Sequence, residues 1–121
     1  ALDKIVVTIL GITFKENVPD IRNTRVIDII TELNNQQITT QVYDPLADRN
    51  DVKEEYNINL TEFDKLQKAN AIILAVAHDE FVEQGWKLIS ELLVSEGSLV
   101  YDIKCILDRN KKPKNINLIR L

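Results

Sequence analysis

Short apolar runs alternate with amphipathic segments along this sequence. The segment Ala71–Ala77 (AIILAVA) is the most continuous apolar run, which is typical of a central strand buried on both faces. The run Ile5–Leu10 is apolar and rich in β-branched residues, so it predicts a second buried strand. Further strands are expected at Thr39–Tyr43, Ser98–Asp102 and Asn117–Leu121.

The segments between these runs carry apolar residues at helical spacing. An amphipathic helix is expected at Thr24–Asn35, with Asn23 or Thr24 as its cap. The other expected elements are helices at Ala47–Tyr56, Glu62–Lys68 and from Trp86 to Leu93, a loop or helical turn at His78–Gln84, and a short edge strand at Ile58–Leu60. Alternating strands and helices imply right-handed crossovers. We therefore predict an α/β fold, a three-layer α/β/α Rossmann-like domain with a mainly parallel sheet of about five or six strands.

Composition and charge narrow the classes of protein that fit this fold. The 121 residues suit one domain, and the formal net charge of −4 argues against nucleic acid or an anionic membrane as partner. No apolar run is long enough to span a membrane, and a single cysteine fits a reducing compartment, so we expect a cytoplasmic protein. Because the sequence starts with Ala1 rather than Met, we expect a piece of a longer chain.

The polar connection after the first strand holds the best candidates for ligand binding. A turn at Gly11 is followed by two cations, Lys15 and Arg22, and then by the expected helix start. A helix N-terminus has free N–H groups and the positive end of the helix dipole, so this order of elements suits an anion. Asp20 could orient Arg22 or accept hydrogen bonds from the loop backbone.

Three polar segments are expected to meet at one edge of the sheet. In a doubly wound sheet, ligands bind beyond the carboxyl ends of the strands, where the winding reverses. That edge would hold the loop Gly11–Asn23, the segment Ala77–Phe81 and the residues after Asp102. His78, the only histidine, is a candidate neighbour of the ligand there, although a lone histidine is more often structural.

Other motifs favour structural roles. The chain has no G-x-G-x-x-G and no P-loop, so Asp44 before Pro45 indicates a turn rather than a ribose-binding acid. One histidine and one cysteine make a structural zinc site improbable, and no metal site is predicted. Cys105 follows Lys104, but no base is evident, so we interpret it as an incidental cysteine rather than a nucleophile.

The stretch LGITFKENVPDIRNTRVIDII resembles the start of the C-terminal domain of the UDP-glucose/GDP-mannose dehydrogenase family. The family pattern is G-x-x-F-K, followed several residues later by D-x-R-x-S/T. Its positions here are Gly11, Phe14, Lys15, Asp20, Arg22 and Thr24. The segments VYDP, AVAHDEF and VYDIKCILD follow in the family's order, so the resemblance covers essentially the whole chain. The loop is most similar to the UDP-N-acetylhexosamine 6-dehydrogenases, which serve capsule or O-antigen synthesis.

This resemblance implies a larger oxidoreductase. Such an enzyme has an N-terminal NAD-binding domain, a central helical region that forms a homodimer, and a C-terminal domain that closes over the UDP-sugar. Two NAD-dependent oxidations convert C6 of the sugar to a carboxylate. The catalytic cysteine belongs to the central region, so no catalytic residue is expected in this chain, and NAD is expected mainly on the missing N-terminal domain.

The resemblance also assigns roles to single residues. Phe14 and Lys15 match the pair that contacts the UDP-sugar, and Arg22 matches an arginine that reaches NAD across the domain interface. Lys104 aligns with a substrate-binding arginine, whose charge it keeps without the bidentate fork. The alternative is a free-standing, non-catalytic nucleotide-binding or regulatory module. A receiver-type signalling domain fits less well, because residues 11–13 lack its acidic cluster.

Overall fold

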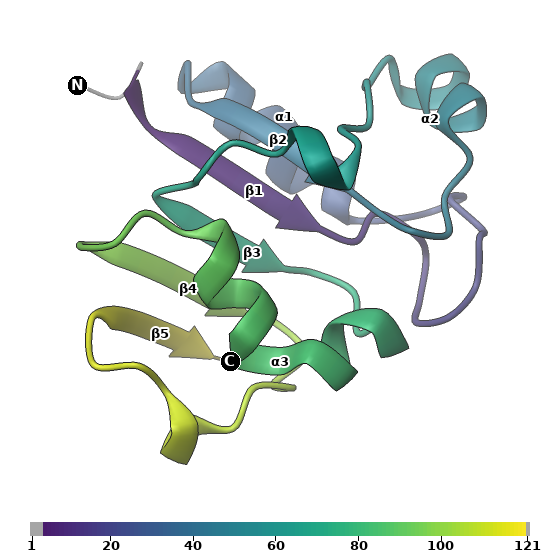
Figure 1. The fold of residues 1–121 in the computed structure, drawn as a ribbon. Coiled ribbons are helices and arrows are strands. Elements are labelled where there is room, and N and C mark those ends of the chain that lie inside the picture. The colour runs from purple at the N-terminus through teal and green to yellow at the C-terminus, as the bar shows by residue number, and fades with distance from the viewer. Residues whose placement is uncertain (1–3, 121) are drawn as a thin grey trace.

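Five parallel strands form the centre of this fold in a computed structural model that describes residues 4–120 (Figure 1). Their order in the sheet is β2-β1-β3-β4-β5. The strands are β1 (Val6–Leu10), β2 (Thr39–Tyr43), β3 (Ala71–Leu74), β4 (Ser98–Asp102) and β5 (Ile116–Arg120). The predicted parallel sheet is confirmed, and Leu121, expected at the end of β5, lies outside the described residues.

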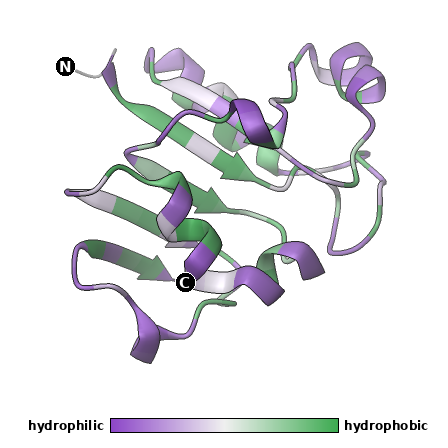
Figure 2. Cartoon of the chain, viewed as in Figure 1, coloured by the Kyte–Doolittle hydropathy of each residue, from purple (hydrophilic) through white to green (hydrophobic). Residues whose placement is uncertain are grey.

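Helices cover both faces of the sheet. The elements are α1 (Val26–Asn35), α2 (Arg49–Tyr56) and α3 (Asp79–Leu92), with single 3-10 turns η2 (Phe63–Lys65) and η3 (Arg109–Lys111). Alternate strand residues supply two separate cores, because Ile9 packs with α1 on one face and Leu10 packs with α3 on the other. Figure 2 shows hydrophobic residues along most of β1 and β3 at the centre of the sheet. The predicted three-layer arrangement is therefore confirmed.

Helix α1 begins two residues later than expected. Asn23, which has a left-handed φ of 59°, and Thr24 both precede the cap position, so the expected cap is wrong. Arg25 takes the cap position without a side-chain cap hydrogen bond, and the Thr24 hydroxyl accepts the Val26 N–H at 3.3 Å. Consequently Arg25 lies at the N-terminus of α1 and not within its first turn.

Helix α3 joins two segments that the sequence separates. The segment His78–Gln84, expected as a loop or helical turn, is helical from Asp79 on, and the helix continues to Leu92 across a kink at Gly85. Gly85 has φ 48° and ψ −132°, which favours glycine. Phe81 before the kink and Leu88 after it are both buried in the same core. The parts of α3 on either side of the kink therefore pack against the same core.

The connection between α2 and β3 differs from the prediction. Residues 58–60 form no strand, and the helix expected at 62–68 is only the single turn η2. Asn57 ends α2 in the left-handed region, and the segment then finds partners outside any ladder. The guanidinium of Arg49 donates to the Leu60 carbonyl, and Thr61 N–H donates to the Val42 carbonyl. These non-local contacts replace the predicted strand.

The winding of the sheet reverses between β1 and β3, which are hydrogen-bonded neighbours. The chain first moves from β1 to β2 on one side and then to β3, β4 and β5 on the other. Gly11 ends β1 with φ 98°, and a Cβ there would lie only 2.5 Å from the Val76 Cβ. This close approach brings the loops after β1 and β3 together at the edge where ligands bind in such folds.

One apolar strip of the sheet extends past α1, whose Leu33 borders it. Leu99 on β4 and Ile119 on β5 face the α1 side and are 37% and 48% exposed. With Ala71, Ile73 and Tyr101 they line a shallow apolar groove of about 180 Å³. Parallel sheets are normally covered on both faces, so the exposure of apolar side chains on this part of β4 and β5 is unusual.

Candidate functional site

The loop that follows β1 is held at its base by short-range hydrogen bonds. The Phe14 N–H donates to the Asp20 carbonyl at 2.7 Å, and the Thr13 hydroxyl donates to the Lys15 carbonyl at 3.0 Å. Asn17, at the turn between them, has a left-handed φ of 64°. The side chains of Phe14 and Lys15 are exposed, so the loop presents them to solvent from a fixed backbone.

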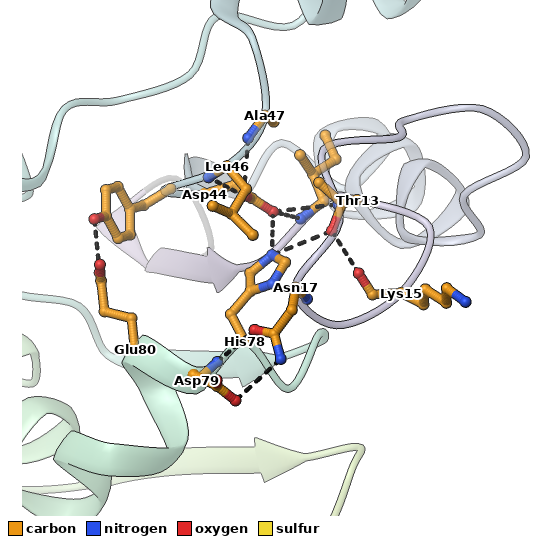
Figure 3. A network of polar contacts seen from close by, with 11 residues as sticks. Thr13, Lys15, Asn17, Asp44, Leu46, Ala47, His78, Asp79 and Glu80 are labelled. Carbon is orange, nitrogen blue, oxygen red and sulfur yellow. Dashed lines mark hydrogen bonds and ion pairs between the residues drawn. The ribbon is translucent and has the colours of Figure 1, made fainter.

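His78 fixes the loop to the rest of the fold (Figure 3). The Asn17 N–H donates to its Nδ1 at 3.0 Å, so that nitrogen must be the acceptor and the proton lies on Nε2. Nε2 is 2.9 Å from Asp44 Oδ2 and 3.1 Å from Thr13 Oγ1. The ring is therefore neutral, and its side chain is only 1% exposed.

Asp44 is the acceptor at the centre of this network. Its Oδ2 accepts the N–H groups of Ile12 and Thr13, at 2.7 and 3.2 Å, and its Oδ1 accepts those of Leu46 and Ala47. Burial alone would raise the pKa of this carboxyl, but the hydrogen bonds from His78 and the backbone outweigh it and hold the pKa below 3.8. The predicted Asp-Pro turn is confirmed, and the same carboxylate also anchors the end of β1.

Two further contacts join the loop and β2 to the start of α3. Asn17 Oδ1 accepts the Asp79 N–H at 2.9 Å, and its Nδ2 donates to Asp79 Oδ1 at 3.0 Å. The Tyr43 hydroxyl donates to Glu80 Oε2 at 2.7 Å, and burial, together with that carboxylate, raises the pKa of the phenol. Sequence alone assigned no role to Asn17, but in the structure it attaches the loop to His78 and Asp79.

A cavity of about 340 Å³ opens where β1 and β3 end, as the topology predicts. Its walls are residues 13–15 of the β1 loop, residues 23–26 and Ile29 at the start of α1, Ala75 and Val76 after β3, and Ile103 and Lys104 after β4. The cavity therefore brings together Phe14, Lys15 and Lys104, although up to 90 residues separate them in the sequence. His78 does not line this cavity; it lies buried behind the loop.

Arg22 and Asp20 lie in a separate shallow hollow beside α2. The Asp20 carboxylate accepts both Nε and Nη2 of Arg22, at 3.1 and 3.0 Å, as well as its backbone N–H. The side-chain hydrogen bond with Arg22, followed by its backbone hydrogen bond, lowers the pKa of Asp20 to about 2. Asp20 therefore both orients Arg22 and accepts a hydrogen bond from the loop backbone, and the exposed Arg22 lines this hollow rather than the cavity.

The cavity is strongly biased toward anions. Its described lining includes three cations, Lys15, Arg25 and Lys104, and no acidic residue. Clustered like charges with no compensating carboxylate create a local positive potential. Arg25 had no predicted role, because the sequence pattern places it on the polar side of the expected helix; in the structure it is the N-cap residue and lines the cavity.

Metal and membrane sites find no support among residues 4–120. No group of three or more His, Cys, Asp or Glu side chains there is arranged to hold a metal ion. Cys105 is exposed next to Lys104 but does not line the cavity. No helix in the described part of the chain is long and apolar enough to cross a bilayer.

Sequence comparisons identify relatives of this chain. A family model described as "UDP-glucose/GDP-mannose dehydrogenase family, UDP binding domain" matches residues 8–109. A UDP-N-acetyl-D-glucosamine 6-dehydrogenase of Pseudomonas aeruginosa is 42% identical over 87% of the chain and 25% of the relative. Protein CapL of Staphylococcus aureus is 36% identical over 95% of the chain and 27% of the relative. The chain thus spans about a quarter of the length of these relatives.

Solved structures share the fold at low sequence identity. An NDP-N-acetyl-D-galactosaminuronic acid dehydrogenase from Methanosarcina mazei superposes with a TM-score of 0.84 at 15% identity, over 98% of this chain and 25% of that one. A UDP-D-ManNAc dehydrogenase from Pyrococcus horikoshii gives a TM-score of 0.75 at 18% identity, over 98% and 26% of the two chains. At these identities the likeness establishes the fold.

Proposed function

The chain belongs to the UDP-glucose/GDP-mannose dehydrogenase family as its UDP-binding domain, and we propose that it holds the UDP-sugar substrate of an NAD-dependent 6-dehydrogenase. The observation that carries this proposal is the cationic cavity at the reversal of the sheet, which has Phe14, Lys15 and Lys104 in its walls. A nucleoside diphosphate has the complementary charge and fits a cavity of about 340 Å³.

Each of these side chains suits one part of such a ligand. Lys15 and Lys104 approach from the loops after β1 and β4, so two ammonium groups can share the charge of a diphosphate. The ring of Phe14 is 53% exposed at the cavity wall and offers an apolar surface to a base or sugar. The neutral His78 and its partners hold the loop that carries Phe14 and Lys15.

We further propose that the sugar is an N-acetylhexosamine. The relatives that are 41–42% identical are UDP-N-acetyl-D-glucosamine 6-dehydrogenases, whereas the UDP-glucose 6-dehydrogenases of Rickettsia are only 28–30% identical. Oxidation of C6 would give the uronic acid that capsule or O-antigen synthesis consumes, and the similarity to CapL supports this role. The cytoplasm, where nucleotide-sugars are made, is the proposed location.

The residues present do not form a site for the NAD pyrophosphate. A dinucleotide needs a glycine-rich turn before a helix, but only Gly11 follows β1, and Val76 fills the space beside it. We therefore propose that NAD, which accepts the hydride, is held by another part of the enzyme. Arg22 is 82% exposed at its side chain, so it remains our candidate for a contact with NAD across a domain interface.

A larger protein is also part of the proposal. The chain covers about a quarter of its relatives, and Leu99 and Ile119 stay 37% and 48% exposed in an apolar groove that α1 only borders through Leu33. We propose that the remaining domains of the same polypeptide, which would carry the catalytic nucleophile and the homodimer contact, cover this strip. Backbone amide exchange at residues 99–101 should then be slower in the longer polypeptide than in this chain; equal rates would contradict it.

Calorimetric titration of the chain with UDP tests the binding role. Saturable binding is expected, and Lys15→Ala or Lys104→Ala should each weaken it by roughly 5- to 150-fold, the loss of one charge-assisted contact worth about 1–3 kcal/mol. Lys111→Ala is the matched control, because Lys111 is an exposed lysine on η3 that does not line the cavity. An absence of saturable UDP binding would overturn the proposed function.

A further inference from the structure

Arg25 occupies a distinctive position in the cavity wall. It is the N-cap residue of α1 and lines the same space as Lys15 and Lys104, although it comes from a different element. Arg22, only three residues earlier, lines the separate hollow beside α2. Two arginines that are close in sequence therefore face different surroundings.

The two guanidinium groups also differ in their partners. Arg22 is held by a two-point ion pair with Asp20. The Arg25 side chain, in contrast, makes no hydrogen bond or ion pair with any residue from 4 to 120, and no acid lines the cavity within that range. A cation placed beside two other cations, without a carboxylate, is electrostatically unfavourable until an anion neutralises the group.

Arg25 is the one guanidinium among the described residues that line the cavity. Guanidinium presents a planar fork of donors that matches two phosphate oxygens, whereas an ammonium group acts as a point charge. Helix α1 begins at the next residue, Val26, so the positive end of its dipole lies at the same wall. The fork and the dipole thus meet at one place in the cavity.

We propose that the guanidinium of Arg25 binds two oxygens of the diphosphate of the nucleotide-sugar, and that Lys15 and Lys104 add further positive charge. This inference rests on the proposed function, since it assumes that the cavity takes a nucleoside diphosphate. It assigns phosphate recognition to the start of α1, and it leaves Arg22 free of any role in holding UDP.

Three variants and two ligands test this assignment in calorimetric titrations of the chain. Arg25→Ala should weaken UDP binding by about tenfold or more, and Arg25→Lys, which keeps the charge but removes the fork, by about three- to tenfold. Uridine, which has no phosphate, should bind all variants within about twofold of the wild type. Arg109→Lys, at an exposed arginine on η3 that does not line the cavity, is the matched control and should leave UDP binding unchanged.

The outcomes separate this inference from the proposed function. If the wild-type chain binds UDP and both Arg25 variants bind it equally well, the role of Arg25 is overturned while the proposed function stands. Equal losses for UDP and uridine would also overturn it, because Arg25 would then only shape the loop. If the wild-type chain does not bind UDP, both proposals are wrong. Thermal unfolding of each variant verifies that this exposed position does not alter folding.

Discussion

Nε2 of His78 lies 2.9 Å from Oδ2 of Asp44, and both side chains are almost wholly buried. Asp44 directly follows β2 and His78 directly precedes α3, so this one contact joins the ends of two strands that are not neighbours in the sheet. The strand between them, β1, contributes its loop through Thr13 and Asn17. The segments that support the loop after β1 therefore form a single hydrogen-bonded network.

Replacing His78 should loosen the loop of β1. In His78→Ala the Asn17 N–H loses its acceptor and Asp44 loses a donor, so the free energy of unfolding should fall by about 2–3 kcal/mol. Hydrogen exchange, read by NMR, should become faster at the Asn17 amide than the loss of global stability explains. Glu83→Ala, at an exposed site on α3, is the control and should change neither quantity. Unaltered exchange at Asn17 would show that His78 does not hold the loop.

Acid should destabilise the fold through Asp44. Its pKa in the folded state is below the ordinary value of 3.8, so its contribution is fully present above that value and is lost as the pH falls through the folded pKa. The free energy of unfolding in urea should therefore decline from pH 5 toward pH 2. Asp44→Asn should be less stable at pH 7 but should show a shallower decline. Parallel pH profiles for the two proteins would contradict this role.

Gly11 is the position where the backbone tolerates no side chain. Gly11→Ala should lower the free energy of unfolding by about 3 kcal/mol, because strain at positive φ adds to a clash with Val76. Gly97→Ala separates these causes: φ is 69° there, but no heavy atom lies within 4 Å of an added Cβ. That variant should lose only about 1–2 kcal/mol. Equal losses in denaturant unfolding would exclude the clash as a cause.

The Asp20–Arg22 pair should be visible in a carboxyl titration. The side chain of Arg22 holds the pKa of Asp20 at about 2, so the Asp20 carboxyl carbon should titrate with that midpoint in an NMR experiment. In Arg22→Gln the midpoint should move up toward 3.8, since the guanidinium that favours the ionised form is gone. Arg25→Gln should leave it unchanged. Because the pair is exposed, stability near pH 7 should hardly change in either variant.

The longer enzyme should distinguish Lys15 from Arg22. Lys15→Ala should raise KM for the UDP-sugar by roughly 5- to 150-fold, whereas Arg22→Ala should act mainly on the use of NAD. The reason is that Lys15 lines the cavity, while the exposed Arg22 lines the separate hollow beside α2. Steady-state kinetics with each substrate varied in turn provides the measurement. Equal effects of both variants on the UDP-sugar would contradict the division between the two residues.

Hydrophobic pattern alone predicted most of the sheet. The bounds of β2 and β4 match the expected strands, because each is a short run with β-branched or aromatic residues next to a turn residue, Pro45 after β2 and Gly97 before β4. The same pattern failed at Ile58 and Leu60, whose apolar side chains are packed by α2 and whose backbone is tied to Arg49 instead of a strand. Burial was correctly signalled there, but the type of backbone pairing was not.

The candidate site was predictable in its location but not in its membership. The topology predicted that Lys15 and Lys104 lie at one edge of the sheet. Arg25 was not predicted there; it lines the cavity as the N-cap of α1, which begins two residues later than expected. The contact of Asp44 with His78 spans 34 residues, so no local pattern could reveal it. The sequence made His78 a candidate neighbour of the ligand and Asp44 a turn residue, whereas their contact with each other belongs to the tertiary structure.

The cavity has a thermodynamic consequence for the whole molecule. Its walls come from the ends of β1, β3 and β4 and from the start of α1, so the site exists only when these elements are assembled. A nucleotide that occupies it would bind the folded state and not the unfolded chain. At a hundred times its dissociation constant, such a ligand adds about 2.7 kcal/mol to the free energy of unfolding. Ligand binding and folding would then be thermodynamically coupled, so that a higher ligand concentration increases the folded fraction.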